Sequence, residues 1–434
     1  MVRDGWLDDF QVPALSSFVD EVLLNSPNYK ETAFRMEAAS HNVRVSGASL
    51  LPTLEAGFDA SRTRRSNPNT TNNELSLGLT ARWEADVWGR LSDQKSSAAA
   101  SYDVARYDFM GARLSLAAQV SQAWFDVVEA RAQQELAQRT VDSYEGTVRI
   151  VRNRFNRGLS SGLDLRLTLS NLEASRSSLS NRENLLAQAK RTLEILAGRY
   201  PSASFKISGD LPEIISAVPA GLPSDILERR PDLQAAKSRL LVASYSTDAA
   251  KKALLPSFKL TASGNNSTDK FSDLLKFDNI FWNMVGGITQ PLFEGGRLRY
   301  GAKAEQARFE AEKQAFARTL LAAFKEVEDA LSSDKAFEER VRFTAKAAEN
   351  AIAAEAVALD QYSQGLIKIS VLLESQRQSL AQQSALLLIK KQRINNRIAL
   401  HLALGGDFTH SEDTQARNNN ETILSKVEKE GKAS

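Results

Sequence analysis

The sequence predicts a mainly α-helical protein built from two copies of one unit, in which a long helical hairpin carries a β-hairpin at its far end. Three observations support this fold class. Sequence landmarks recur at a constant spacing, two long runs contain hardly a helix breaker, and short segments alternate between apolar and polar residues. The chain has 434 residues, of which 42% are hydrophobic and 25% charged, a composition typical of a folded protein.

Paired landmarks reveal the internal repeat. Pro27 and Pro231 lie 204 positions apart, whereas Gly198 and Gly405 lie 207 positions apart, and a hairpin loop absorbs the three-residue change. We therefore divide the chain into an N-terminal segment, a first repeat, a linker, a second repeat and a tail expected to be disordered, at residues 1–26, 27–200, 201–226, 227–406 and 407–434.

Each repeat opens with a helix that begins at Pro27 or Pro231, because proline suits the first helical turn, where its missing N–H is not needed. The spacing of apolar residues then changes from a helical period to a period of two, which is typical of a strand. Apolar residues alternate with polar residues or glycine over 54–61 and 75–84, which predicts two strands joined by a turn around Asn67-Pro68-Asn69. In the second repeat, strands are expected over 258–263 and, more weakly, over 282–293.

After each β-hairpin comes an alanine-rich helical run, over residues 92–156 and 298–364. Each helix would span roughly 100 Å, and so long a helix must pack along its length. A glycine-containing turn, at 158–162 or near Gly365, leads into a returning helix that ends at Gly198 or Gly405. The chain therefore offers two long helical hairpins.

Charge and composition exclude several classes of protein. The 55 basic and 53 acidic residues leave a net charge of +2, which gives no electrostatic case for a nucleic-acid partner. Cysteine is absent, and no apolar stretch approaches the roughly 18–20 residues of a transmembrane helix. His41, His401 and His410 lack metal-ligand spacing, and Gly295-Gly296 lacks the lysine and Ser/Thr of a phosphate loop. We expect no enzymatic activity, metal or cofactor.

Alternating strands of about ten residues with one apolar face are what a membrane-spanning barrel requires, although a soluble sheet packed on a core alternates as well. Stoichiometry favours the barrel. Four strands cannot close, whereas three protomers supply twelve, and the same symmetry closes the long helices into an α-barrel. Aromatic residues at the strand ends fit interfacial girdles and fit core packing equally well: Trp83, Trp88, Trp282 and Phe293.

Several segments resemble one family. Residues 83–90 (WEADVWGR) and 290–297 (QPLFEGGR) resemble the paired strand-to-helix signatures of the TolC-like outer membrane factor family, in its efflux-lipoprotein (NodT) branch. Residues 222–233 (LPSDILERRPDL) resemble the segment that opens the second repeat in that branch. Residues 362–366 and 372–377 resemble its second hairpin tip. The resemblance covers roughly residues 6–405.

This resemblance implies a homotrimeric, passive exit channel of a tripartite efflux system, located in the outer membrane and spanning into the periplasm. Its implied partners are membrane lipid, a periplasmic adaptor (membrane fusion protein) and an inner-membrane RND-type pump. Mature members of this lipoprotein branch usually begin at a lipidated cysteine upstream of the region matching Trp6. This chain has no cysteine and an acidic start, so we expect either that it stays inside the cell or that its native N-terminus lies further upstream.

A passive conduit needs a polar lumen and a gate rather than a catalytic site. The polar phase of the strands predicts which side chains face the lumen. Ordinary solvated surface charge is the alternative interpretation of the same residues. They are Glu55, Asp59, Glu74, Thr80, Arg82, Lys259 and Thr261.

The gate is expected at the periplasmic helical tips. The resemblance places an acidic residue near the constriction at Glu374, and three such carboxylates in a trimer would form a ring that favours cation or proton occupancy. Asp164 is a second candidate, although its position also suits a helix N-cap. Tyr362 is a third, either as a hydrogen-bonding or as a packing residue. The resemblance places adaptor contact at Arg157, Gly158, Gly162, Gly365 and Lys368.

Two other functions stay open from the residues alone. A soluble coiled-coil scaffold would explain the Ala-, Gln- and Glu-rich helices, but it predicts sustained a/d heptads, whereas the apolar stripes here are interrupted. A periplasmic adaptor also has a long helical hairpin, but it would need only one, together with substantial additional β domains.

Overall fold

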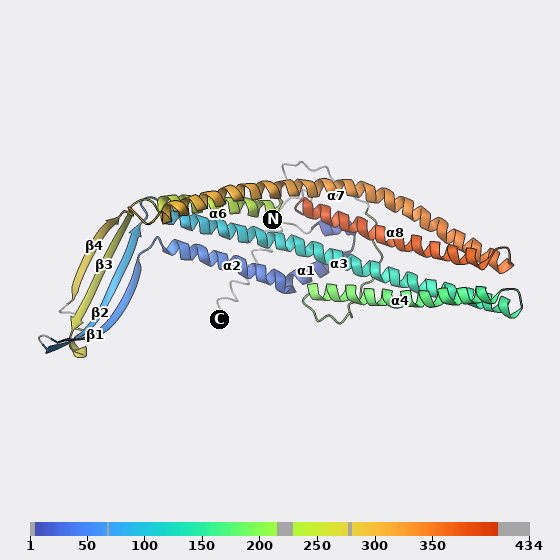
Figure 1. Ribbon diagram of the computed structural model, residues 1–434, viewed down its shortest axis with the longest axis horizontal. Helices are drawn as coiled ribbons and strands as arrows, with labels where there is room; N and C mark the ends of the chain where they lie inside the picture. Colours follow the sequence, from blue (N-terminus) through green and yellow to red (C-terminus); the bar gives the residue numbers. More distant parts are fainter. Residues whose placement is uncertain (1–4, 67–68, 215–228, 277–279, 407–434) are drawn as a thin grey trace.

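The computed structural model describes residues 5–66, 69–214, 229–276 and 280–406. In this part of the chain the protein is elongated, with the strands at one end and the turns of two helical hairpins at the other (Figure 1). The turn expected at Asn67-Pro68, part of the linker and the tail at 407–434 lie outside the described residues.

A helix, two strands, a long helix and a returning helix follow one another in this order twice. The first half contains η1 (Gly5–Phe10), α1 (Pro13–Asn25), α2 (Pro27–Ala48), β1 (Thr53–Ser66), β2 (Asn69–Ala85), α3 (Arg90–Asn156) and α4 (Gly162–Leu196). The second half contains α6 (Pro231–Lys252), β3 (Ser257–Thr268), η2 (Phe271–Asp273), β4 (Phe281–Thr289), α7 (Arg297–Gln364) and α8 (Ile369–Ala403). The predicted fold class, a mainly helical chain with duplicated long hairpins and four strands, is confirmed.

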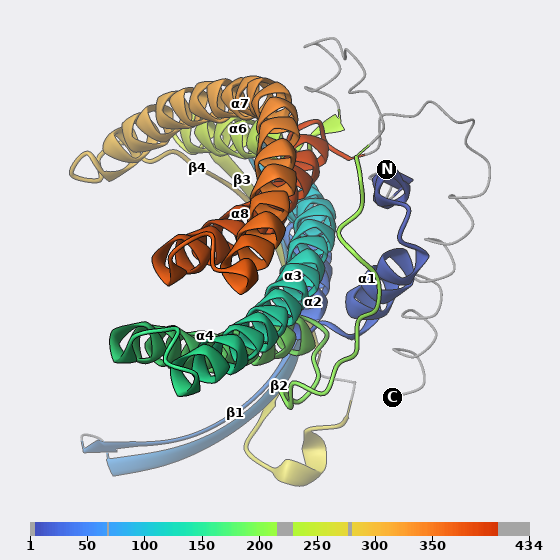
Figure 2. The same ribbon diagram turned by 90° about the vertical axis from the view of Figure 1, so that its right-hand side faces the viewer.

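The two longest helices, α3 with 67 residues and α7 with 68, are each roughly 100 Å long. Both pack along their length, as such helices must: α3 contacts α2, α6, α4 and α8, and α7 contacts α6 and α8. Seen end on, α3/α4 and α7/α8 form two separate curved pairs (Figure 2). The two hairpins meet mainly where α3 contacts α8.

The strands form one antiparallel sheet in the order β1-β2-β3-β4. Strand β4 ends at Thr289, four residues earlier than the alternation around Phe293 predicts. Pro291 explains the difference, because proline has no N–H to donate to the neighbouring strand. In this chain β1 and β4 are exposed over their whole length, so neither face of these strands is covered.

The largest apolar core lies where the middle of α3 meets the N-terminal segment and the end of α8. Trp6, Phe10 and Phe18 are all at most 5% exposed, and Phe18 packs on Trp124 of α3 with ring centroids 5.6 Å apart. A second, smaller core lies near the hairpin tips. Residues 5–26, which the sequence alone marks only as a leading segment, therefore contribute much of the central core.

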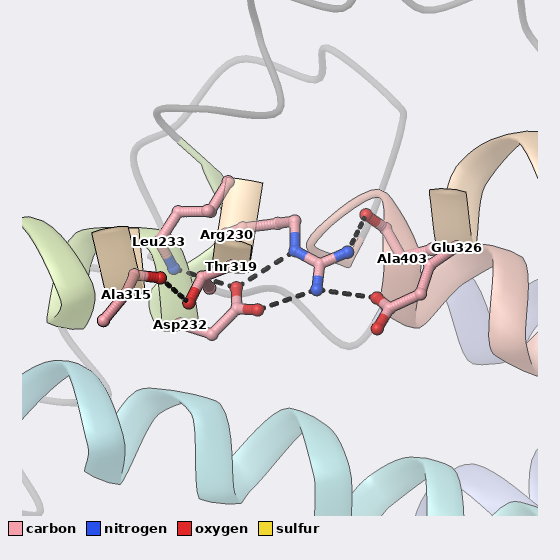
Figure 3. Close-up of polar contacts among 7 residues, drawn as sticks. All are labelled: Arg230, Asp232, Leu233, Ala315, Thr319, Glu326 and Ala403. Atoms are coloured by element: carbon pink, nitrogen blue, oxygen red, sulfur yellow. Dashed lines mark hydrogen bonds and ion pairs between the residues drawn. The ribbon is translucent and has the colours of Figure 1, made fainter. Parts of the chain in front are cut away.

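The start of the second repeat is fixed by a buried arginine (Figure 3). Arg230 donates to Asp232 at the start of α6, to Glu326 of α7 at 2.8 Å and to the carbonyl of Ala403 at 3.0 Å. Burial alone would lower the pKa of Arg230, but its two carboxylate partners outweigh burial and raise it. This one side chain therefore joins three helices of the second repeat.

Candidate functional site

The strand register separates a polar from an apolar face. Side chains paired across an antiparallel sheet share a face, so Glu55 opposite Thr80 and Arg82 opposite Thr261 belong to the same side. The same register puts three further residues on this side: Asp59, Glu74 and Lys259. All seven predicted lumen residues therefore lie on one face of the sheet. Cross-strand contacts link them: Arg82 pairs with Glu55, and Ser267 donates to Glu74 at 2.9 Å.

The opposite face carries apolar side chains that this chain leaves exposed. Leu54 is 70% exposed and Met284 63% exposed. All four predicted girdle aromatics are exposed, Trp282 and Phe293 the most. An exposed apolar surface of this kind marks a contact with lipid or with another chain.

The other two girdle candidates act as anchors of the helix–strand junctions. Trp83 donates its indole N–H to the carbonyl of Leu50 at 3.0 Å, and Trp88 donates to that of Pro256 at 2.8 Å. Next to them, the Asp86 carboxylate accepts the N–H groups of Leu91 and Ser92 at the start of α3. The sheet is therefore tied directly to the long helices.

At the first hairpin tip Asp164 is part of a capping box. Ser161, the N-cap residue of α4, accepts the N–H of Asp164 at 3.1 Å, and the Asp164 carboxylate accepts the N–H of Ser161 at 3.0 Å. The backbone hydrogen bond from Ser161, with smaller contributions from the Ser160 and Ser161 hydroxyls, lowers the pKa of Asp164. The capping role, which the sequence left open beside the gate, accounts for these contacts.

At the second tip Tyr362 is buried beneath an arginine from the first hairpin. The Arg154 guanidinium lies 5.2 Å from the centre of the Tyr362 ring, and it donates to the carbonyls of Tyr362 at 3.1 Å and Ser363 at 3.3 Å. Among the described residues, the Tyr362 hydroxyl has no hydrogen-bond partner. Within one chain Tyr362 is thus a packing residue, and Arg154 joins the two tips.

Glu374 is exposed on α8 and pairs with Arg377 one turn further on. Among the described residues, Glu374 forms no hydrogen bond or ion pair with Asp164, so the two acidic candidates are not brought into one cluster. The five candidate adaptor-contact residues are all exposed at the tips. Exposed leucines accompany them: Leu159, Leu163 and Leu366.

Sequence reasoning missed Arg154 and Gln376, two residues that join the hairpins. Gln376 of α8 is 4% exposed and donates to the hydroxyls of Ser143 and Thr147 of α3, both at 3.0 Å. These partners are separated by more than 200 positions, so neither spacing nor periodicity could connect them. The one available signal was a polar residue at an otherwise apolar helix position.

No helix in the described residues is both long and apolar enough to cross a membrane. Within the same residues, no group of three or more His, Cys, Asp or Glu side chains is arranged to hold a metal.

Two long helical hairpins tied to a sheet with one polar and one apolar face define an outer-membrane channel protomer. The channel CmeC of Campylobacter jejuni has the same fold, with a TM-score of 0.89 over 97% of this chain and 91% of that one, at 24% identity. The sequence model of the outer membrane efflux protein family matches residues 18–199 and 222–406, and the chain belongs to this family.

Curated relatives agree with this assignment. The chain is 29% identical to the pyoverdine export outer membrane protein OpmQ of Pseudomonas aeruginosa, over 95% of this chain and 89% of that protein. It is 27% identical to the cation efflux system protein CusC of Escherichia coli, over 93% and 88%.

The protein is therefore the outer-membrane channel of a tripartite efflux system; it lies in the outer membrane, spans into the periplasm and is not an enzyme. The family prediction is confirmed, and the scaffold and adaptor alternatives are wrong. Membership of the lipoprotein branch stays a prediction.

Proposed function

We propose that three copies of this chain close into one tube. The open sheet carries this proposal: β1 and β4 are its two edges, both faces of these strands are uncovered, and one face is apolar. Pairing β4 of one copy with β1 of the next would satisfy both edges and give a closed barrel of twelve strands. The repeats at 27–200 and 227–406 then each contribute one helical hairpin to the wall.

The polar face of the sheet then lines the lumen and the apolar face meets lipid. Charges of both signs, from Glu55, Asp59 and Glu74 and from Arg82 and Lys259, suit a conduit that passes varied cargo. The chain is 29% identical to a relative named for pyoverdine export and 27% identical to one named for cation efflux. These nearly equal identities favour no single cargo.

The partners are a periplasmic adaptor at the hairpin tips and, through it, an inner-membrane RND-type pump. The tips expose leucines beside basic groups at Arg157 and Lys368. Gly158 and Gly365, with φ of 72° and 81°, give both tips the same tight turn. Two such surfaces per chain would present six docking turns in the trimer.

The gate lies at these tips, with the three Glu374 carboxylates as a ring and the Arg154 contact holding each pair of tips together. Asp164 and Tyr362 support it from within, one by capping α4 and the other by packing under Arg154. Removing the Arg154 guanidinium frees the second tip, whereas removing the Glu374 charge changes which ions pass.

Conductance of purified protein in planar bilayers tests the proposal. A trimer is expected, near three times 47.7 kDa. Glu374→Gln should reduce cation over anion selectivity, and Arg154→Ala should raise conductance several-fold. Glu338→Gln, an exposed carboxylate of α7 away from the tip, is the matched control and should change neither. Selectivity and conductance that stay unchanged in both tip variants would place the gate elsewhere, and a monomer would refute the tube.

A further inference from the structure

The apolar face of the sheet changes character abruptly along β1. The side chains at positions 54, 56, 58 and 60 are leucine, alanine, phenylalanine and alanine, and the next two in the same phase are Arg62 and Arg64. Side chains two positions apart on a strand share a face, so these arginines continue the apolar face rather than the lumen face. Both are exposed. The apolar face of β1 therefore ends in two cations.

The strand register extends this change across the sheet. Leu75 of β2 pairs with Thr268 of β3. Two positions towards the outer end, Asn73 of β2 pairs with Arg62, and two positions beyond Thr268 comes Lys270. Lys270 keeps extended backbone, with φ of −123° and ψ of 132°. The alternation therefore places Lys270 level with Arg62 on the same face, two strand spacings or about 10 Å away.

The segment that follows β3 folds back onto this apolar face. Asn266 lies on the face as the partner of Leu77 and is 6% exposed. Its amide donates to the carbonyls of Asp273, Leu274 and Lys276 at 3.2, 2.8 and 2.9 Å. Backbone carbonyls that enter a lipid layer need such partners, because water does not reach them there. Asn266 therefore holds the segment in a form that lipid tolerates.

This segment, residues 270–276, exposes apolar and basic side chains together at the end of the sheet away from the helices (Figure 1). Phe271 is 74% exposed and Leu275 is 70% exposed. Lys270 is exposed beside them, and Lys276 forms an ion pair with Asp273 at 2.8 Å. Large apolar groups next to cations suit a membrane interface, where one part meets acyl chains and the other meets headgroups.

The length of the apolar face gives the depth of the cations. From Trp83 to Leu75 the apolar face of β2 runs about 27 Å along the strand. A strand tilted by about 40° then spans roughly 20 Å of membrane height, close to the apolar band of about 25 Å that outer-membrane barrels present to lipid. Arg62 lies one residue pair beyond this band. It therefore stands at the level of the headgroups.

The two edges of the apolar band differ in chemistry. A tryptophan marks the inner edge, next to the helices, whereas Arg62, Arg64 and Lys270 mark the outer edge. Residues 60–73 contain three arginines and no acid, and Asp269 falls in the lumen phase. Guanidinium groups bind phosphate through paired, charge-assisted hydrogen bonds. The outer edge therefore fits a lipid that carries several phosphates together with acyl chains.

We propose that Arg62, Arg64 and Lys270, here called the outer rim, bind the phosphates of the phosphorylated glycolipid in the outer leaflet, while Phe271 and Leu275 enter its acyl layer. The inference rests on the proposed trimeric barrel, whose apolar face meets lipid. A trimer presents three such sites around its circumference. Bound glycolipid fixes the height of the barrel in the membrane, because the cations cannot move into the acyl layer.

Native mass spectrometry of the purified trimer with bisphosphorylated lipid A tests the outer rim. Arg62→Gln should weaken binding about tenfold, the effect of losing one hydrogen bond to a charged group. Arg62→Lys should recover part of this loss. The triple variant Arg62→Gln, Arg64→Gln, Lys270→Gln should bind at least ~30-fold more weakly. Arg65→Gln is the matched control: Arg65 is the next arginine on β1 but falls in the lumen phase, so affinity should stay within about twofold.

Lipid A without phosphates separates the two parts of the site. The wild type and the triple variant should bind it equally, because the outer rim then has no phosphate to hold. Phe271→Ser should weaken the binding of both forms about fivefold, since it removes apolar contact area. Phosphatidylglycerol, which has one phosphate, should bind the wild type about tenfold more weakly than bisphosphorylated lipid A.

The proposal is overturned if the triple variant binds bisphosphorylated lipid A like the wild type. It is also overturned if Arg65→Gln weakens binding as much as Arg62→Gln, because overall charge would then explain the attraction. Equal affinity for phosphatidylglycerol would rule out the glycolipid as the specific partner. In all three cases a protein that still forms the trimer leaves the tube intact, whereas a wild-type chain that purifies as a monomer refutes the tube itself.

Discussion

The two repeats match in backbone geometry and differ in the polar groups around it. Three pairs of glycines 207 positions apart share positive φ angles: 76° and 85° at Gly89 and Gly296, 72° and 81° at Gly158 and Gly365, and 69° and 83° at Gly198 and Gly405. Each pair stands at the same place, before the long helix, at the tip or after the returning helix. Duplication has therefore kept the turns that only glycine makes easily.

The side chains beside those turns have diverged. Ser161 caps α4 with its side chain, whereas its counterpart Lys368 gives α8 no side-chain cap. Glu194 in the first repeat binds backbone N–H groups of the following segment, whereas its counterpart His401 pairs with Asp9 at 3.0 Å. Each repeat thus reached the same shape with different polar contacts.

The largest effect is expected where the glycine after a returning helix lies close to the backbone just before Pro27 or Pro231. A Cβ on Gly405 would lie 3.0 Å from the backbone of Arg229, and one on Gly198 would lie 3.2 Å from the carbonyl oxygen of Asn25. Gly405→Ala should lower the free energy of unfolding by about 2–4 kcal/mol, because a positive φ alone costs about 1–3 kcal/mol and the clash adds to it. Thermal or denaturant unfolding of the trimer measures this.

Gly158→Ala is the control for backbone strain. Gly158 has a positive φ, but nothing lies within 4 Å of where an added Cβ would be, so the variant should lose only the stability that the backbone strain costs. Equal losses for Gly158→Ala and Gly405→Ala would show that the close approach to Arg229 contributes nothing.

An intermediate, pH-dependent effect is expected at Glu194, which is 3% exposed. Burial alone would raise the pKa of Glu194, but hydrogen bonds from the N–H groups of Ala203, Phe205 and Ser204 outweigh it and lower the pKa. Its stabilising contribution is therefore complete above the ordinary glutamate pKa and is lost as the pH falls through the lowered folded value. Glu194→Gln should lower the free energy of unfolding by about 1–2 kcal/mol near neutral pH. Because the variant lacks this carboxylate, its stability should fall less steeply than that of the wild type as the pH is lowered.

Melting temperatures across the acid range, from pH ~6 down to pH ~3, measure this difference. Glu21→Gln, which removes the half-exposed ion pair with Arg199 in the same region, should shift stability by less than about 1 kcal/mol. If the melting temperatures of Glu194→Gln and the wild type fall equally steeply with decreasing pH, Glu194 is not the source of this pH dependence.

The smallest effect concerns the helix caps. Ser161→Ala should destabilise the first tip by about 1 kcal/mol through loss of the capping box, and Lys368→Ser should stabilise the second tip by about 0.5–1 kcal/mol. The N-cap backbone of Lys368, with φ of −78° and ψ of 151°, already suits a serine cap. Amide hydrogen exchange at the first turns of α4 and α8 measures the two effects. Unchanged exchange at the start of α8 in Lys368→Ser would show that the new serine does not cap this helix.

Local signals predicted the helices well. The expected ends at Asn156 and Gln364 agree with α3 and α7, and the starts differ by two residues and one. Glycine turns and uninterrupted helical runs are encoded within short windows, which is why they could be recognised. The end of β4 was overestimated because alternation continues to Phe293 although Pro291 interrupts the ladder.

The candidate site was only partly predictable. Strand alternation correctly grouped Glu55, Arg82 and Lys259 on one face, because the side-chain period of two is a local property. Contacts across the hairpins, such as Arg154 with Tyr362, depend on how α3 lies beside α7 and α8. Such contacts are created by tertiary packing, and no window of sequence contains them.

The close approach at the glycine that follows each returning helix has a consequence for the origin of the protein. Gly198 lies so close to Asn25, and Gly405 to Arg229, that an added Cβ would crowd the backbone there, so each half is closed by a close approach within itself. A gene for one half would already encode its own closure, and six such halves surround the axis of the proposed trimer. Fusing two genes in tandem therefore turns a ring of six identical subunits into a ring of three without requiring a new joint.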